Sequence, residues 1–312
     1  MDGATDASKI VDLPIHYVER TVRVTKMTKP LHERAGHTED VLSRPSKSEA
    51  GVGPAGAPQR GPEGGPEWIA EHRAVWHRKP GLRAVYRRYF RRLRAACHSG
   101  WPVVEIGSGP GFLKEFYPDI VSTDVMPSPY VDRVIDASAM PFADGEVGTL
   151  LLIDVFHHLP RPDLFLREAA RVLKPHGRLV MMEPWMGLAG WLFHRFVHHE
   201  ECDLRVPLDA PWGEVAKDPM AGNTALAHVY FRAGGELERL GLPLRITCRE
   251  PFAAFSWLLS GGFQPINLLP EGFVGAAERI DAVLSLVPRL TAMRCFLIVE
   301  RTETPRLTSP RA

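Results

Sequence analysis

The chain has 312 residues, of which 45% are hydrophobic and 24% are charged, and its formal net charge is +1. This composition is typical of a globular chain with a sizeable core, arranged as one large α/β domain with extra elements or as two small domains. The balanced charge excludes a global field that would steer the protein toward nucleic acid. The four cysteines lie far apart, which fits neither a disulfide framework nor a zinc ribbon and suits a reducing cytoplasm. Since the first residues lack a signal-peptide pattern and no apolar stretch reaches the ~18 residues of a membrane span, we expect a cytoplasmic protein.

Gly and Pro dominate residues 44–66, a composition that cannot bury enough apolar surface to offset the cost of ordering and that predicts a disordered linker. The preceding residues 10–24 alternate weakly and fit either an isolated strand pair or an extension without its own fold; we favour the extension, because a lone hairpin is marginal in water. We therefore expect a mostly disordered segment over residues 1–66, one domain over residues 67–303 and a disordered tail over residues 304–312.

An amphipathic helix is predicted between His72 and Arg94. This stretch holds nine Lys or Arg residues and no acid, with apolar residues at helical spacing and an interruption at Lys79-Pro80-Gly81. One interpretation is a helix packed on the domain with solvated arginines. The other is a surface for phosphate-bearing or membrane-bound substrates, which would bring peripheral membrane contact.

From residue 101 onward strands alternate with helices, which indicates a parallel sheet covered by helices on both faces. The expected strands cover residues 103–106, 119–124, 132–136, 150–155 and 178–182, and a helix covers residues 163–173. A helix and a strand follow within residues 234–250, inserted helices within residues 252–291, and a last strand at residues 294–301. We predict a doubly wound, Rossmann-like α/β fold with a mostly parallel seven-stranded sheet.

The strongest functional signal is the sequence VVEIGSGPG at residues 103–111. A buried strand brings Glu105 to its carboxyl end, and Gly107, Gly109 and Gly111 then allow a tight turn whose backbone a ligand can approach. A dinucleotide site would need its third glycine at the position of Phe112, so the spacing disfavours a dinucleotide-dependent oxidoreductase.

Asp124 ends the second expected strand, seventeen residues after Gly107. A carboxylate at this place can accept hydrogen bonds from both hydroxyls of a ribose, as in nucleotide-binding α/β folds. The alternative is a turn residue in front of Met126 and Pro127.

Residues 101–184 resemble class I S-adenosylmethionine-dependent methyltransferases of the methyltransferase type 11 group, which includes quinone-ring methyltransferases. The resemblance rests on the stretches EIGSGPG, STD, DASAMPFADGEVGTLLLIDVFHHL and LREAARVLKPHGRLVMMEP, which follow the family's order over about a quarter to a third of the chain. It implies an enzyme that binds S-adenosylmethionine and transfers its methyl group. His176 departs from the family's Gly-Gly turn, at a place far from the cofactor.

The resemblance also implies where the cofactor lies. Its amino-acid part would be held by Glu105, Gly107, Ser108, Gly109 and Gly111. Its ribose would be bound by Asp124, and its adenine would lie beside Val125, Met126, Asp136 and Ala137. Its sulfonium would lie near Asp154, Val155 and Phe156.

A methyl sulfonium is a strong electrophile, so the protein mainly has to align an acceptor and, where necessary, remove a proton. The candidate bases are His157 and His158, just past the fourth strand, and Glu183, at the end of the fifth. The histidines have an alternative role in packing or capping, which the family often gives a histidine here.

Residues 185–203 are rich in Trp, Phe and His. His194 and His198 are four residues apart and would share one helix face, with Glu201 or Cys202 a turn further on, a spacing that suits a transition metal. They would equally suit a His-rich helix over the substrate pocket, and we assign no metal.

We expect residues 185–223 and 252–291 to pack together as a lid over the methyl position, because ligands of this fold bind beyond the carboxyl ends of the strands. Their aromatic side chains would give a largely apolar pocket. The alternative is a satellite core with no opening.

The leading hypothesis is methyl transfer to a small-molecule acceptor, apolar or aromatic, at O, N or C. The alternatives are a cofactor-binding protein without methyl transfer, and a methyltransferase that acts on a lipid-linked or nucleic-acid substrate. We expect no nucleic acid as a partner, since the fourth strand lacks an (N/D)PP(Y/F) motif and no RNA-binding module is appended. The oligomeric state is left open.

Overall fold

The structure of the chain is a computed structural model that describes residues 66–206 and 221–303. The predicted disordered extension and tail fall on residues 1–65 and 304–312, outside this part of the chain, as do residues 207–220 of the expected lid. The first described helix begins at Glu67, next to the predicted boundary. Within the described ranges no helix has the length and hydropathy that crossing a membrane would require.

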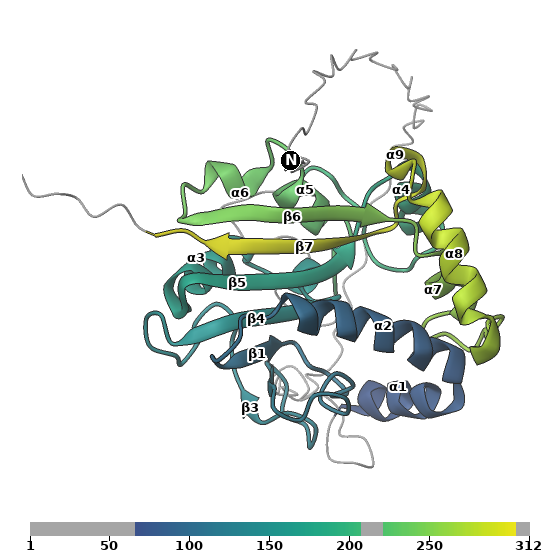
Figure 1. Cartoon of the computed structure of the whole chain (residues 1–312), viewed down its shortest axis with the longest axis horizontal. Coiled ribbons are helices and arrows are strands. Elements are labelled where there is room, and N and C mark those ends of the chain that lie inside the picture. Colours follow the sequence, from purple (N-terminus) through teal and green to yellow (C-terminus); the bar gives the residue numbers. More distant parts are fainter. Residues whose placement is uncertain (1–65, 207–220, 304–312) are drawn as a thin grey trace, which may run out of the picture. The chain divides into compact units, whose positions relative to one another are not determined.

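In the described part of the chain, a seven-stranded sheet runs in the order β3-β2-β1-β4-β5-β7-β6 (Figure 1). The strands are β1 (Val103–Ile106), β2 (Val121–Asp124), β3 (Arg133–Val134), β4 (Val147–Ile153), β5 (Leu173–Pro184), β6 (Leu244–Phe252) and β7 (Arg294–Arg301). Strands β1 to β5 run parallel, and β7 lies antiparallel between β5 and β6. The predicted doubly wound, mostly parallel fold is confirmed.

The strand order reverses at β1, because the chain builds outward through β2 and β3 on one side and through β4 and β5 on the other. The register pairs Val104 of β1 with Val121 of β2 and with Leu150 of β4. The loops that follow these three parallel strands therefore leave the sheet at the same edge. In open α/β sheets a ligand binds at such a switch point, beyond the carboxyl ends of the strands.

Strands β2 to β5 differ from their predicted bounds, and two of the differences have a visible cause. Strand β2 begins at Val121, because Ile120 belongs to a turn in which its N–H donates to the carbonyl of Tyr117. Strand β5 begins at Leu173 and includes His176, which takes the left-handed backbone conformation with φ 61°. A glycine adopts this conformation at no steric cost, which gives the family's glycine at this turn a physical reason.

One face of the sheet is covered by helices α1 (Glu67–Arg78), α2 (Pro80–Ala96), α7 (Phe255–Ser260) and α8 (Val274–Leu284), with the short η3 (Glu271–Phe273). The predicted basic amphipathic helix is confirmed as α1 and α2. Helix α2 buries Leu82, Val85, Tyr86, Tyr89, Phe90 and Leu93 against the sheet. Its outer face exposes Arg87, Arg88 and Arg91.

Lys79 is buried at the break between α1 and α2. Pro80 begins α2, a position where the N–H that proline lacks would have no partner in the helix. The Lys79 ammonium donates to the carbonyl oxygens of Ser260 (3.0 Å), Gly262 (2.9 Å) and Ile266. Burial lowers the pKa of Lys79, and the neighbouring positive charge of Arg78 lowers it further. The break between the helices is thus tied to the segment after α7.

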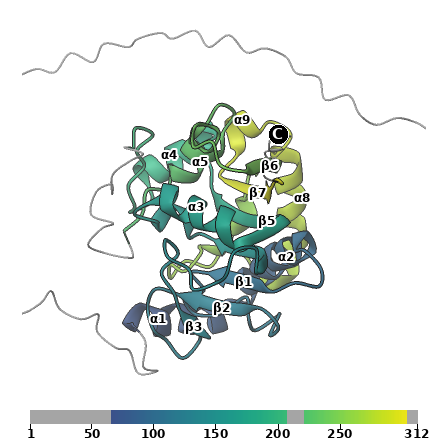
Figure 2. The same cartoon turned by 90° about the vertical axis from the view of Figure 1, so that its left-hand side faces the viewer.

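The opposite face is covered by α3 (Pro162–Val172), α5 (Leu226–Phe231) and α6 (Glu236–Arg239). Figure 2 shows the sheet between these two layers, with α3 and α5 on one side and α2 and α8 on the other. Phe156, Tyr230 and Phe231 pack their rings together under α5, with centroids 4.8 to 6.3 Å apart. Two separate apolar layers therefore enclose the sheet, as the alternation of strands and helices predicted.

The two expected lid segments contact each other where they are described. Helix α4 (Leu188–Phe196) comes from the first segment and α9 (Pro288–Thr291) from the second. A Cβ added at Gly190 would lie 2.6 Å from the carbonyl oxygen of Ala292, so only glycine allows this approach. The rings of Phe193 and Trp257 lie 6.2 Å apart. Contact between the segments is observed, and their action as a lid remains a prediction.

Candidate active site

The glycine loop after β1 requires its glycines for two reasons. Gly107, Gly109 and Gly111 have φ 69°, 48° and 74°, in the left-handed region. A Cβ at Gly107 would also lie 2.6 Å from the side chain of Val155, and one at Gly111 would lie 2.9 Å from Tyr130. The loop is therefore pressed between the end of β4 and the segment after β2.

Glu105 stands at the base of this loop, on β1. It is buried, and its Oε2 has no hydrogen-bond partner. Burial raises the pKa of Glu105 to about 7, against the lowering effect of Ser108. A buried carboxylate oxygen without a donor fits the positively charged ammonium group of an amino-acid ligand.

Asp124 binds the loop from the neighbouring strand. Its Oδ2 accepts from Gly109 N and its Oδ1 from Met126 N, both at 2.9 Å. Burial raises the pKa of Asp124, while these backbone hydrogen bonds lower it. Each carboxylate oxygen keeps a further lone pair, so the residue can still receive the ribose hydroxyls that the resemblance implies.

The residues expected around the adenine follow β2 and β3. Val125 is 55% exposed, and Met126 is half-buried. Asp136 is exposed and its Oδ1 accepts from Ser138 N at 2.7 Å, while Ala137 is buried. Ser108 Oγ accepts from Thr123 N at 3.0 Å, which joins the glycine loop to β2. The structure thus brings the predicted cofactor residues to one edge of the sheet.

Helix α1 covers the glycine loop, which the sequence reasoning did not foresee. A Cβ at Gly109 would lie 3.1 Å from the ring of Trp68. Trp68 also meets the ring of His72, which stacks on Phe263 with centroids 4.5 Å apart. Figure 1 shows α1 and α7 at the end of the sheet where the arrow of β5 terminates. The available signal was the spacing of Trp68 and His72, which lie one helical turn apart.

An ion pair between the partly exposed Asp154 and the buried Arg294 lies just past β4. Asp154 has φ 55°, an uncommon conformation for a residue other than glycine. Its carboxylate pairs with Arg294 at the start of β7, and Tyr86 Oη donates to Asp154 Oδ2 at 3.5 Å. The negative charge of Asp154 raises the pKa of the Arg294 guanidinium against the opposing effect of burial. The rings of Tyr89 and Trp257 lie 5.3 and 5.4 Å from that guanidinium.

Arg294 was missed as a site residue. The available signal was an arginine followed by five apolar residues at the start of the strand Arg294–Arg301, where a charge is buried only with a partner.

The predicted catalytic residues His157, His158 and Glu183 are brought together where β4 and β5 end. Glu183 is fully buried, and its Oε1 accepts from Val155 N and Phe156 N, both at 2.9 Å. His157 Nδ1 donates to Glu183 Oε2 at 2.7 Å. Glu183 therefore holds the loop after β4 in place through three donors.

Glu200 joins this group from the segment after α4, and the sequence reasoning missed it. Its Oε2 lies 3.3 Å from His157 Nε2, and its Oε1 lies 3.9 Å from His158 Nε2. Burial lowers the pKa of His157, but Glu183 and Glu200 outweigh it and raise the pKa to about 10. Burial raises the pKa of Glu200, yet His157 and its neighbours lower it to about 2. Burial and the charge of His157 lower the pKa of His158.

The metal set suggested by the spacing of His194 and His198 is not assembled. Helix α4 ends at Phe196, so the periodicity that would carry Glu201 or Cys202 onto the same face stops too early. Cys202 Sγ instead lies 3.6 Å from Met186 Sδ. The rings of His194 and His198 still lie 5.2 Å apart, and burial lowers the pKa of His194 to about 3.

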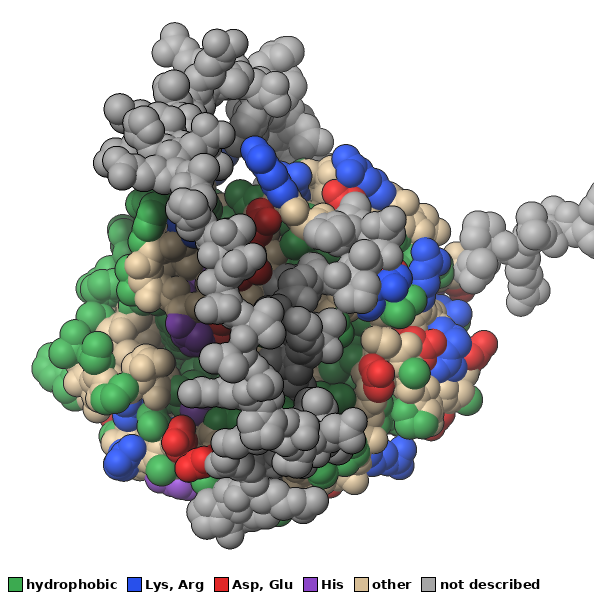
Figure 3. Space-filling model, turned by 180° about the vertical axis from the view of Figure 1, so that it is seen from behind, with side chains coloured by type: hydrophobic (Ala, Val, Ile, Leu, Met, Phe, Trp, Pro, Cys, Tyr) green, Lys and Arg blue, Asp and Glu red, His purple; other side chains and the backbone are tan. Residues whose placement is uncertain are grey.

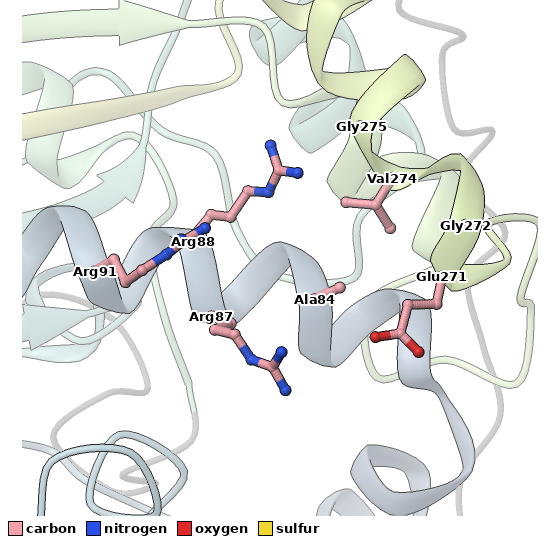
Figure 4. Close-up of a pocket in the computed structure, with 8 residues that line it drawn as sticks. All are labelled: Ala84, Arg87, Arg88, Arg91, Glu271, Gly272, Val274 and Gly275. Atoms are coloured by element: carbon pink, nitrogen blue, oxygen red, sulfur yellow. The ribbon is translucent and has the colours of Figure 1, made fainter.

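Two hollows among the described residues lie away from the glycine loop. The first, about 440 Å³, lies between α2 and the start of α8. Figure 4 shows its lining residues, Ala84, Arg87, Arg88, Arg91, Glu271, Gly272, Val274 and Gly275. Arg88 extends toward α8, where it pairs with Glu278. The second hollow is lined in part by Tyr89, Met182 and Phe252.

The fold places the glycine loop, Glu105 and Asp124 at the switch point of the sheet, with a polar cluster past β4 beside them. Residues 104–181 match the family model described as a methyltransferase domain. The chain therefore carries an S-adenosylmethionine-dependent methyltransferase domain, as the resemblance implied. Its activity is methyl transfer and its cofactor is S-adenosylmethionine.

Comparison with solved structures finds distant likenesses. A chain of the Haloferax volcanii complex between the Trm112 methyltransferase activator and a methyltransferase is 16% identical, with 76% of this chain and 96% of that chain covered and a TM-score of 0.43. Geranyl diphosphate C-methyltransferase from Streptomyces coelicolor is 12% identical, with 70% and 79% covered and a TM-score of 0.43. At these values the likenesses add nothing to the assignment. No curated protein sequence matches the chain.

Proposed function

We propose that this domain methylates a small apolar or aromatic molecule, bound beyond the ends of β4 and β5 beside Asp154. The observation that carries the proposal is the ion pair of the partly exposed Asp154 with the buried Arg294 within aromatic surroundings. Sites for small molecules are typically apolar, with a few fixed polar groups that orient the ligand. The ion pair supplies such groups, and the rings of Tyr86, Tyr89 and Trp257 supply the apolar surroundings.

The cofactor residues support S-adenosylmethionine binding at the ends of β1 and β2, next to β4 in the sheet. The unpartnered Oε2 of Glu105 suits the ammonium group of S-adenosylmethionine, and Asp124 suits its ribose. When bound, S-adenosylmethionine supplies an electrophilic methyl group. The residues of the chain then have to align the acceptor and remove its proton.

We assign different roles to the three predicted catalytic residues. Glu183 is fully buried and already accepts from three donors, so it positions the loop after β4 and His157. His157 lies between Glu183 and Glu200, with both ring nitrogens directed at carboxylates. His158 is the most exposed of the three and has a lowered pKa. The acceptor proton is therefore lost beside His158.

A labelled-methyl assay tests the proposal. The full chain is incubated with methyl-labelled S-adenosylmethionine and a panel of phenols, quinols and fatty acids, and in parallel with protein and RNA fractions. We expect label in a product that organic solvent extracts, and a loss of at least about tenfold in kcat/KM for Trp257→Ala, which removes a ring from the acceptor's surroundings. Label confined to protein or RNA would overturn the proposal. Calorimetric binding of S-adenosylmethionine with no label in any fraction would also overturn the proposed acceptor class.

A second candidate function, methylation of a lipid-linked acceptor, is favoured by a surface that we call the apolar edge. It consists of exposed side chains on and after α4, α8 and α9: Leu188, Leu192, Phe196, Val197, Ile280, Val283, Leu286, Val287 and Leu290. Figure 3 shows apolar side chains gathered at the edge of the molecule where α4 lies. Contiguous exposed apolar surface is uncommon on a protein that contacts only water.

Sedimentation with vesicles tests this candidate. The chain should co-sediment with phosphatidylglycerol vesicles and less with phosphatidylcholine vesicles, because the exposed arginines of α2 favour anionic lipid. Replacing both Phe196 and Leu286, which are 70% and 79% exposed, by Gln should abolish the binding. A chain that stays in the supernatant with both vesicles does not act at a lipid surface.

A further inference from the structure

His157, His158 and Glu200 converge just past β4, and one ligand atom from each lies within 4.8 Å of the others. We infer that these three side chains bind one divalent transition-metal ion, for which Zn²⁺ is the best match. The inference deepens the proposed function, and the part of the metal in methyl transfer rests on it. The binding itself is argued from the contacts of the three residues.

Both histidines are held in the orientation that metal binding requires. His157 donates through Nδ1 to Glu183 Oε2 at 2.7 Å, and His158 through Nδ1 to the carbonyl of Ala221 at 3.1 Å. With its proton on Nδ1, each ring presents the lone pair of Nε2 on its other side. Metal-binding histidines almost always have such a partner, a carboxylate or a backbone carbonyl, that fixes the tautomer.

Glu200 faces both free nitrogens. Its Oε2 lies 3.3 Å from His157 Nε2 and has no hydrogen-bond partner, and its Oε1 lies 3.9 Å from His158 Nε2. Ligand atoms bound to one ion at about 2.0–2.2 Å lie a little over 3 Å apart in a tetrahedron, so these distances need little adjustment. Two imidazoles and one carboxylate form a donor set that suits Zn²⁺.

Neighbouring residues pack closely around His157, His158 and Glu200. A Cβ at Gly222 would lie 2.9 Å from His158 Nδ1 and 3.0 Å from Glu200 Oε2, so the backbone closes against both ligands only because residue 222 is glycine. The N–H of Glu200 donates to His198 Nδ1 at 3.4 Å, and the buried His194 Nδ1 has no hydrogen-bond partner. Three protein ligands leave one position of a tetrahedral ion for a water molecule or for the hydroxyl of an acceptor, whose proton the cation makes easier to remove.

A metal-free alternative is an ionic group in which a doubly protonated His157 bridges Glu183 and Glu200. The two arrangements differ at one atom. The ionic group needs a proton on His157 Nε2, whereas the metal needs the lone pair of that nitrogen. Direct measurement of metal binding therefore separates them.

The full chain is stripped with a chelator and titrated with Zn²⁺ against a chromophoric competitor. We expect one Zn²⁺ per chain with a micromolar or lower dissociation constant. His158→Ala and the isosteric Glu200→Gln should each weaken binding by at least about 100-fold. His77→Ala, which removes an exposed histidine of α1, should bind as the unaltered chain does. Circular dichroism shows whether each variant is folded.

Co²⁺ provides a second measurement that needs no variant. Visible d–d absorption typical of four- or five-coordinate N/O ligation supports the site, and octahedral absorption with binding weaker than millimolar overturns it. Zn²⁺ affinity that is unchanged in both folded variants also overturns it. Calorimetry should show S-adenosylmethionine binding unchanged within about twofold after chelation. A chain that binds Zn²⁺ at this site yet labels no small molecule would disprove the proposed function and leave the metal site standing.

Discussion

The cofactor side and the proposed acceptor side of the site are built in different ways. The cofactor side is assembled from one short stretch of sequence, in which Glu105, Gly109 and Asp124 lie within 20 residues of one another. The acceptor side is assembled from distant segments: Asp154 pairs with Arg294, 140 residues away, and Glu200 reaches His157 from beyond α4. Methyltransferases of this kind share one cofactor, which needs one fixed geometry, whereas their acceptors differ and need different geometries. We therefore expect changes on the cofactor side to affect binding more than stability, and changes on the acceptor side to affect stability as well.

The largest effect is expected from breaking the ion pair of the acceptor side. Arg294→Ala should lower the free energy of unfolding by about 3 kcal/mol, because the hydrogen bond of the buried guanidinium to Asp154 and its contacts with the rings of Tyr89 and Trp257 are lost. Chemical denaturation measures this. As a control, Arg94→Ala breaks the exposed pair with Asp119 and should cost less than about 1 kcal/mol. Equal losses in the two variants would contradict the comparison.

On the cofactor side, Asp124→Ala should weaken S-adenosylmethionine binding by about 2–3 kcal/mol, because hydrogen bonds to a charged acceptor are lost. Isothermal calorimetry measures the dissociation constant. Asp144→Ala, at an exposed position before β4, should change it by less than about 1 kcal/mol. If Asp124→Ala binds the cofactor like the unaltered chain, the ribose assignment fails.

Glu105 makes cofactor binding depend on pH. Its pKa of about 7 in the free protein means that the carboxylate carries a proton below pH 7, whereas pairing with the cofactor's ammonium group requires it ionised. The affinity should therefore be constant above pH 7 and fall by up to about tenfold per pH unit below it. Calorimetry from pH 5.5 to 8.5 measures this, and the slope should disappear in Glu105→Gln. A slope that persists in the variant comes from another group.

The same raised pKa affects the stability of the free protein in a defined direction. Between the ordinary value of Glu105 and about 7 the folded state binds more protons than the unfolded state, so this residue makes the protein less stable as the pH rises through that window.

The smallest effect is expected from Trp68, which covers the glycine loop. Trp68→Ala removes an aromatic contact at a half-buried position and should weaken S-adenosylmethionine binding by about 1 kcal/mol. Trp101→Ala, at an exposed position before β1, is the matched control. Tryptophan fluorescence quenching by the cofactor should also decrease in Trp68→Ala alone.

The difference between the two sides explains how much of the molecule could be predicted from its sequence. Strand and helix periodicity predicted the fold, and a local glycine pattern with two acids predicted the cofactor residues. Arg294, Glu200 and Trp68 were missed, because each reaches its site only through the fold, from a segment without a motif of its own. His194 and His198 were treated as members of one helix face, whereas α4 ends between them. Local sequence carries no information about where such a helix stops against its neighbours.

The position of Trp68 has a consequence for time as well as for affinity. Its ring lies over Gly109, so Trp68→Ala should speed both the arrival of the cofactor and the departure of the spent cofactor. Lys79 ties the C-terminal end of α1 to the carbonyl groups after α7, whereas Trp68 lies at the other end of the helix. The residence time of the cofactor then becomes a property of the contacts made by α1.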